Sequence, residues 1–269
     1  MNAAMALIRF TFAEVFHHRA YQLMMLACLL LPWLMLVPMS LFLLDLGKVL
    51  ADLLFTVEHM LMAGFVFFMA LPLMARDIEQ KICHLLLSVP LKRSTYLLSR
   101  YFGMSAAMLP LMGLLLLSSA AVFVFVAYQW PDYTTMDLAW HVPLGEMLLL
   151  LPYLALLGVL FLIVVFASGS SESMVFLFSV WLLSWAVPPV LEALMRPEVA
   201  TKMPHGLFVL VQGLEYILPD LTSAKLSLDI AHAQWPPPDM LWAYVCEHFS
   251  YAAIALIVAM LRFERKDLA

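Results

Sequence analysis

Two adjacent Glu–His pairs lie inside otherwise apolar stretches, and they are the residues of this chain best suited to chemistry. The first pair is Glu58–His59 and the second is Glu247–His248. A charged side chain at the centre of a membrane costs about 2.5–3.5 kcal/mol on insertion scales, so such residues tend to be functional. One hypothesis is that Glu58, His59, Glu247 and His248 line a polar vestibule on the outer side that handles a head group, a peptide or a metal ion.

The sequence leaves two other interpretations of these four residues open. In the first, they are interfacial side chains that reach the lipid head groups, with one Glu–His pair satisfied internally. In the second, His59 and His248 bind a haem or a metal ion in a membrane redox subunit. That interpretation needs two imidazoles that face each other at matching depth, because each would ligate the iron from one side.

Sequence motifs for common catalytic machinery are absent. The only Gly-Lys dipeptide, Gly47–Lys48, lacks the upstream glycine and the following hydroxyl of a phosphate-binding loop. Neither an HExxH zinc motif nor a GxSxG nucleophile motif occurs. The three cysteines, Cys28, Cys83 and Cys246, are too far apart to suggest a disulfide framework or a zinc site. We therefore expect a chain that is not an enzyme by itself and holds no catalytic residue, metal or cofactor.

The elements that carry these residues are predicted to cross a membrane. Hydrophobic residues make up 65% of the chain and charged residues only 12%, against about 25% charged in a soluble domain. A helix of about 20 apolar residues spans the hydrocarbon core. We predict an all-α, polytopic membrane protein with one domain (residues 1–269) and six transmembrane helices. The predicted spans are 20–44, 55–75, 96–128, 147–168, 173–194 and 240–261, with Glu146 and Glu192 at outer ends.

The distribution of basic residues predicts the orientation of the chain. With the N-terminus in the cytoplasm, only four of the 14 Lys and Arg residues fall outside: Lys48, Arg196, Lys202 and Lys225. Basic residues accumulate on the cytoplasmic side of membrane proteins. We therefore expect both termini in the cytoplasm. The charge pattern contains no basic patch for nucleic acid.

Two short segments are predicted to lie along the membrane surface. Residues 3–19 form an amphipathic helix with Thr11 and Glu14 on its polar face, and an apolar face made of Met5, Ile8, Phe12, Val15 and Phe16. The alternative is that this segment simply extends the first span. Residues 207–218 are too few to cross the bilayer, so they predict an interfacial or re-entrant helix on the outer side before the sixth span.

The most organised polar stretch lies between the second and third spans. Residues 77–89 predict a short cytoplasmic helix, and Pro90 ends it because proline has no amide donor. One face of this helix is apolar, with Ile78, Ile82, Leu85, Leu86 and Val89. The other face is polar, with Asp77, Gln80, Lys81, His84 and Ser88. The polar face meets either water or a partner.

The region from Leu73 to Gly103 resembles permeases of the ABC-2 type. That family shows an acidic residue, a Leu-rich turn, Ser/Thr-x-Pro, a basic pair and Leu-Leu-x-Lys/Arg. Matching residues here are Glu79, Leu85–Ser88, Pro90, Arg93, Leu97, Leu98 and Arg100. Lys81 and Ile82 replace the usual Gly-Thr. The tail is similar too: Tyr216–Leu221 and Phe263–Leu268 resemble the last motifs of the branch related to multicopper-enzyme and nitrous-oxide-reductase maturation permeases.

The resemblance implies the membrane subunit of an ATP-driven exporter in the inner membrane of a bacterium. Residues 1–19 would be its elbow helix, and residues 77–89 the coupling helix that docks on a separate ATP-binding subunit. Contacts to that subunit would come from Asp77, Glu79, Gln80, Lys81, His84 and Ser88. Two copies of the ATP-binding subunit would bind ATP and Mg²⁺. Further partners would be a second permease, identical or related, and an accessory protein on the outer side. A membrane assembly factor that transports nothing is a separate alternative.

Overall fold

The computed structural model describes residues 3–42, 45–79, 92–131, 136–195, 204, 206, 208–210, 213, 220–221 and 223–265. Every regular element in this part of the chain is a helix, and six helical segments are long and apolar enough to cross a membrane. These segments are Arg19–Met39, Leu46–Glu79, Arg93–Gln129, Leu138–Phe166, Ser170–Met195 and Pro238–Arg265. The predicted all-α class with six spans is thus confirmed, and the chain is a multi-pass membrane protein by helix length and hydropathy.

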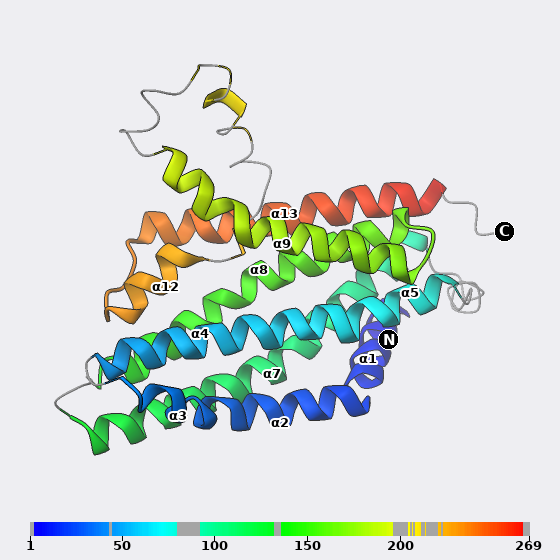
Figure 1. The fold of residues 1–269 in the computed structure, drawn as a ribbon. Coiled ribbons are helices and arrows are strands. Elements are labelled where there is room, and N and C mark those ends of the chain that lie inside the picture. Colours follow the sequence, from blue (N-terminus) through cyan, green and yellow to red (C-terminus); the bar gives the residue numbers. More distant parts are fainter. Residues whose placement is uncertain are drawn as a thin grey trace.

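Consecutive spans run in opposite directions along the bundle, so the bundle has two distinct ends (Figure 1). The elements of the bundle are α1 (Ala3–Phe16), α2 (Arg19–Leu34), α3 (Leu36–Met39), α4 (Leu46–Phe65), η1 (Val66–Ala70), α5 (Leu71–Glu79), α7 (Arg93–Gln129), α8 (Leu138–Phe166), α9 (Ser170–Met195), α12 (Ala224–Ala231) and α13 (Pro238–Arg265). We call one end the α1 end; it holds α1, the last turn of α5, the start of α7, the α8–α9 turn and the last turn of α13. The opposite end, which holds α3 and α12, is the α12 end.

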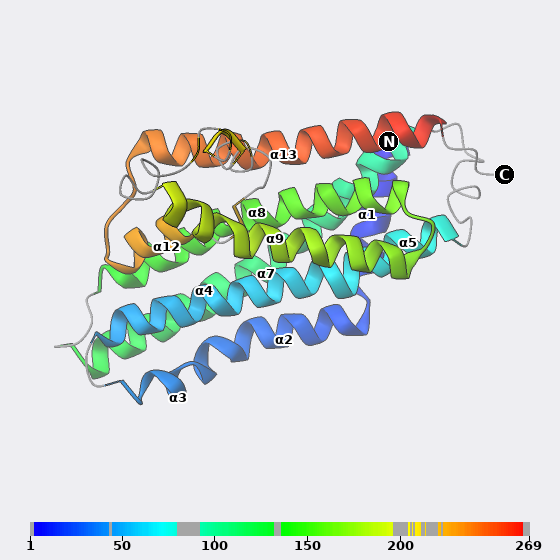
Figure 2. The ribbon, with the colours of Figure 1, turned by 45° about the horizontal axis from the view of Figure 1, so that its top comes forward.

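The core lies between α4, α7 and α8, while α2 and α13 form opposite edges of the bundle (Figure 2). In the apolar window of each span, 67% of the residues are buried in α4–α5 and in α8, but only 17% in α2–α3 and in α9. Exposed apolar surface on this scale is stable only against lipid or another apolar helix. The buried side chains form two apolar clusters, one toward each end of the bundle.

Helix α1 is a separate element that crosses the α1 end at a steep angle to α2 (Figure 1). His17 and His18 form the turn between the two helices, and the His18 side chain caps α2 by accepting the amide of Ala20 at 3.2 Å. The alternative of a simple helical extension is therefore wrong. The predicted face is also corrected, because Thr11 is fully buried against α7 while Met5 is 48% exposed.

The second and fourth spans are longer than predicted. The second begins at Leu46 and runs without a break through the π-helix η1 to Glu79. Asp77–Glu79 therefore belong to this span and do not start a separate helix. The fourth span begins at Leu138, so Glu146 lies two turns inside it and not at its end.

The first span is shorter than predicted, and the last connection contains an unexpected helix. Regular helix α2 ends at Leu34, where the ring of Pro38 would crowd the carbonyl four residues earlier. Helix α12 lies in the last connection and packs on α8 and α4 at the α12 end. Gly145 of α8 has no side chain there, which leaves room for Ile230 of α12. The predicted helix over 207–218 lies almost entirely outside the described residues.

Candidate functional site

Arg100 is the centre of the most connected polar site that the structure describes. It lies in the second turn of α7, and only 1% of its side chain is exposed. Its guanidinium donates to Glu14 Oε2 at 2.7 Å, to Thr11 Oγ1 at 3.1 Å and to the carboxylate of Asp77. One cation therefore joins α1, α5 and α7.

Two further side chains complete the site. Arg76 donates to Glu14 Oε1 at 2.5 Å, and the Tyr96 hydroxyl donates to Asp77 Oδ2 at 2.9 Å. We call Glu14, Arg76, Asp77 and Arg100 the ionic cluster. Its two cations and two anions balance, which is what makes the burial of Asp77 and Arg100 tolerable.

Glu79 connects the end of α5 to the next turn of the bundle. Its carboxylate accepts the backbone amide of Ser170, the first residue of α9. A carboxylate at a helix N-terminus is stabilised by the helix dipole and by the free amides there. A cavity of about 290 Å³ lies beside this contact and is lined by Ala75, Ile78, Glu79, Val164, Phe166, Ala167, Ser168, Gly169 and Ser173.

The start of α7 is fixed to the last turn of α13. Arg93 Nη1 donates to the carbonyls of Phe263 and Glu264, each at 3.4 Å. The rings of Tyr96 and Phe263 stack with their centroids 6.2 Å apart. Both described borders of residues 80–91 are therefore anchored at the α1 end, one on α9 and one on α13.

The predicted partner-contact residues have different positions in this arrangement. Asp77 was expected on a free polar face, but it is 1% exposed and bound to Arg100 and Tyr96, which corrects that expectation. Glu79 contacts α9 through Ser170. Gln80, Lys81, His84 and Ser88 lie outside the described residues.

The four predicted vestibule residues do not line a common surface. Glu58 is fully buried in the bundle, whereas Glu247 is exposed on α13. His59 Nδ1 lies 2.8 Å from the Tyr153 hydroxyl. The His248 ring is buried, with Nδ1 at 2.8 Å from the Tyr244 carbonyl and Nε2 at 3.2 Å from the Asp220 carbonyl. Glu58 and His248 are buried while Glu247 is exposed, so the four side chains do not share one open surface.

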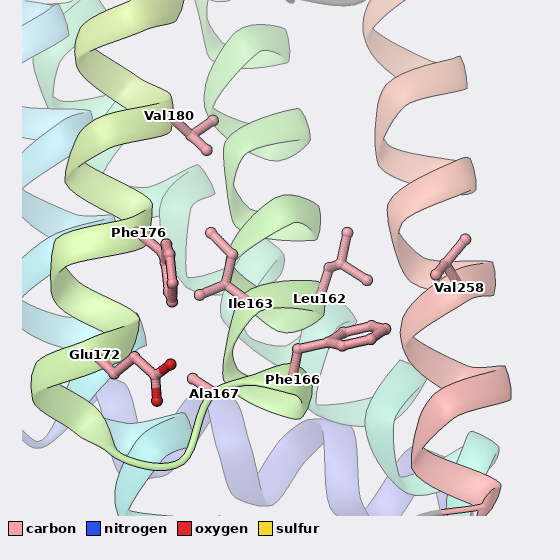
Figure 3. Close-up of a pocket in the computed structure, with 8 residues that line it drawn as sticks. All are labelled: Leu162, Ile163, Phe166, Ala167, Glu172, Phe176, Val180 and Val258. Atoms are coloured by element: carbon pink, nitrogen blue, oxygen red, sulfur yellow. The ribbon is translucent and has the colours of Figure 1, made fainter.

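A second cavity opens between α8, α9 and α13 near the α1 end (Figure 3). Its volume is about 380 Å³, and its walls are apolar except for one carboxylate. The lining residues are Leu162, Ile163, Phe166, Ala167, Glu172, Phe176, Val180 and Val258. Glu172 is occupied by the Ser168 amide at 2.7 Å, so the open part of this cavity suits hydrocarbon.

Sequence reasoning missed the partners of the ionic cluster and a second buried acid. Glu14 and Thr11 were placed on the solvent side of α1, although both bind Arg100. Glu146 was placed at a membrane boundary, although its carboxylate is fully buried. The sequence did contain a signal for this cluster: Arg100 and the acids Glu14 and Asp77 all lie near the same predicted membrane boundary, where opposite charges can pair.

Comparison with known proteins leaves the family of this chain unassigned. No protein-family model matches it, and no curated protein matches it. The fold and the hydropathy define a helical, multi-pass membrane protein with six candidate spans.

Proposed function

We propose that this chain is the permease subunit of an ATP-driven exporter of the ABC type. A second permease, identical or related, completes the translocation pathway with it. Two copies of a separate ATP-binding subunit bind ATP and Mg²⁺ and dock on residues 80–89. The α1 end faces the cytoplasm of a bacterium, and the protein lies in its inner membrane.

The observation that carries this proposal is the ionic cluster, whose residues Asp77 and Arg100 flank residues 80–91 in the sequence. A subunit that moved these residues would pull on α5 at Glu79 and on α7 at Lys92. Buried ion pairs resist such a pull because separating them leaves unpaired charges, each costly in a low-dielectric interior. The motion would then pass as a rigid displacement into α1, α5 and α7 through Arg100.

The resemblance supplies the second line of support. Its coupling-helix motif falls largely on the residues between Glu79 and Lys92. The helix before them is held to α9 through Glu79, and the helix after them is held to α13 through Arg93. Asp77 then transmits force inside the permease, and it does not contact the ATP-binding subunit. The partner contact falls to Gln80, Lys81, His84 and Ser88.

Site-specific photo-crosslinking in the source organism tests the proposal. A photoreactive amino acid at position 84 should capture a polypeptide that binds ATP, identified by mass spectrometry. The matched control is the same amino acid at Tyr128, which is 79% exposed in the last turn of α7 at the α12 end. Capture of an ATP-binding polypeptide from both positions, or from neither, would contradict the proposal.

The haem-binding alternative gains no support from the site. An axial histidine needs a free ring nitrogen, and both ring nitrogens of His248 face carbonyl oxygens. His59 points to Tyr153. No observation favours the assembly factor over the permease.

A further inference from the structure

Glu58 is a fully buried acid without a hydrogen-bond partner. It lies in the middle of α4, its side chain is 0% exposed, and neither of its carboxylate oxygens has a partner in the described part of the chain. Buried polar groups in proteins are nearly always hydrogen-bonded, so an orphaned carboxyl calls for an explanation. An ionised carboxylate in this position would be especially costly.

A second buried acid lies close to it. Glu146 of α8 is also 0% exposed, and the two carboxyls interact electrostatically. Ser119 of α7 donates to Glu146 Oε2 at 2.5 Å, while Glu146 Oε1 has no partner among the described residues. Three core helices thus bring two carboxyls and one hydroxyl into the bundle interior.

These three residues interrupt the apolar core near the junction of its two clusters. On α4, Glu58 lies between Val57 and Leu61 of the cluster toward the α1 end, three residues after Phe55 of the cluster toward the α12 end. On α7, Ser119 lies between Leu115 and Val122 of the two clusters. Glu146 lies among the α8 residues of the cluster toward the α12 end. The three polar residues therefore lie near the junction of the two apolar clusters, within the buried core.

The ion pairs found among the described residues belong to the ionic cluster and do not include these acids. The titratable imidazole on α13 is His248, whose ring packs against that of Tyr244 with the centroids 4.4 Å apart. The titratable groups that interact with Glu58 are Glu146 and Tyr153 from α8, Cys28 from α2 and Tyr244 from α13. His59 of α4 binds Tyr153, and His232 beside α12 interacts with Asp52. Ser119 is the polar contact from α7. None of these brings a permanent positive charge.

We propose that Glu58 and Glu146 form a proton-binding site in the interior of the bundle. One proton is bound to a carboxyl oxygen of the pair, which forms an O–H bond and leaves one negative charge shared between two acids. The proton removes the repulsion of two buried anions and provides the donor that the unpartnered oxygens lack. No other bond changes, because binding and release only move this proton.

The position of the site connects it to the ionic cluster. Helices α4, η1 and α5 form one continuous rod, and Glu58 and Asp77 are 19 residues apart on it, or about 28 Å along the axis. Loss of the proton would push α4 away from α8 at Glu58. The same rod would carry that movement to Arg100. This inference does not depend on the proposed function, since it follows from the buried acids alone.

Infrared difference spectroscopy of the full chain in liposomes tests the site. The wild-type protein should show the C=O stretch of a protonated carboxylic acid at neutral pH, shifted to lower frequency in D₂O. The E58Q/E146Q double variant should lose this band, and E264Q, which changes an exposed acid on α13, should keep it. In each single variant the band should vanish at lower pH than in the wild type, because the neighbouring anion is gone.

Three outcomes would overturn the proposal. The first is a band that persists in the double variant at neutral pH, and the second is a wild-type protein without the band at neutral pH. The third is a band that Na⁺ abolishes in the wild type, which would assign the site to a metal cation. Should the double variant fail to fold, as judged by circular dichroism, comparison of the single variants with E264Q decides the question.

Discussion

Arg100 shows how much one side chain contributes at the residue scale. It is among the largest fully buried side chains, although arginine is rarely buried without partners. Its position is tolerable because Asp77 and Glu14 supply negative charge and Thr11 supplies a hydroxyl. Its Nε atom has no partner among the described residues, so the site depends on the two terminal nitrogens.

Replacement of Arg100 by Met should destabilise the protein strongly. The change leaves Asp77 buried and without its cation, and such losses typically cost about 3–5 kcal/mol. Unfolding of the purified protein in detergent, followed by circular dichroism, measures the effect. The matched control is Arg76→Met, since Arg76 is 43% exposed and surface pairs contribute about 0–1 kcal/mol. Equal losses in the two variants would contradict the central role of Arg100.

Close approach of two helices decides the packing at the element scale. Helix α1 rests on α7 where Gly103 faces Thr11, and a Cβ atom added at Gly103 would come within 2.5 Å of Thr11 Cβ. The contact holds the α1 backbone near enough for Glu14 and Thr11 to reach Arg100. The predicted elbow helix is thus held to the bundle by packing as well as by charge.

Gly103→Ala should loosen α1 and lower stability by about 1–3 kcal/mol, the usual range for an overpacked contact. Thermal unfolding checks the size of the effect. Gly113→Ala is the control on the same helix, because nothing lies within 4 Å of a Cβ added there. A glycine-to-alanine change in an open helical position instead stabilises by roughly 1 kcal/mol. A Gly103→Ala protein as stable as the Gly113→Ala protein would show that α1 adapts without cost.

Orientation in the membrane is a property of the whole molecule. The two described borders of residues 80–91 lie at the α1 end, together with the last turn of α13 (Figure 1). We propose, from the positive-inside pattern of the sequence, that the α1 end faces the cytoplasm.

Cys83 offers a natural probe of this orientation. In a Cys28→Ala/Cys246→Ala background it is the single thiol of the chain. We expect a membrane-impermeant maleimide to label it in inverted vesicles and not in intact spheroplasts. The control is Tyr128→Cys in a chain without Cys83, which lies at the α12 end and should show the reverse pattern. Labelling of Cys83 from the spheroplast exterior would reverse the topology and remove the coupling proposal.

The sequence predicted the elements better than the site, and particular residues show why. The second span was predicted to end at residue 75 because Arg76 and Asp77 are charged, yet α5 continues to Glu79. The charges are accommodated by Glu14 and Arg100, from α1 and α7. Likewise, the fourth span was predicted to begin only after Glu146 because Glu146 is charged. In the structure Glu146 lies within that span, where the Ser119 hydroxyl of α7 donates a hydrogen bond to its carboxylate. In both cases a charged residue was interpreted as the end of a span, because the partner that stabilises it inside the bundle comes from another helix and is not visible in the local sequence.

The sequence by itself determined that this is a six-span helical membrane protein with a separate N-terminal helix. Apolar run length and helix rise are local properties, so each span can be recognised without knowledge of its neighbours. Only the tertiary structure decided which polar groups are buried together. Glu14, Asp77 and Arg100 come from three helices, as do Glu58, Ser119 and Glu146. Their meeting depends on how the helices pack and rotate, which no local pattern records.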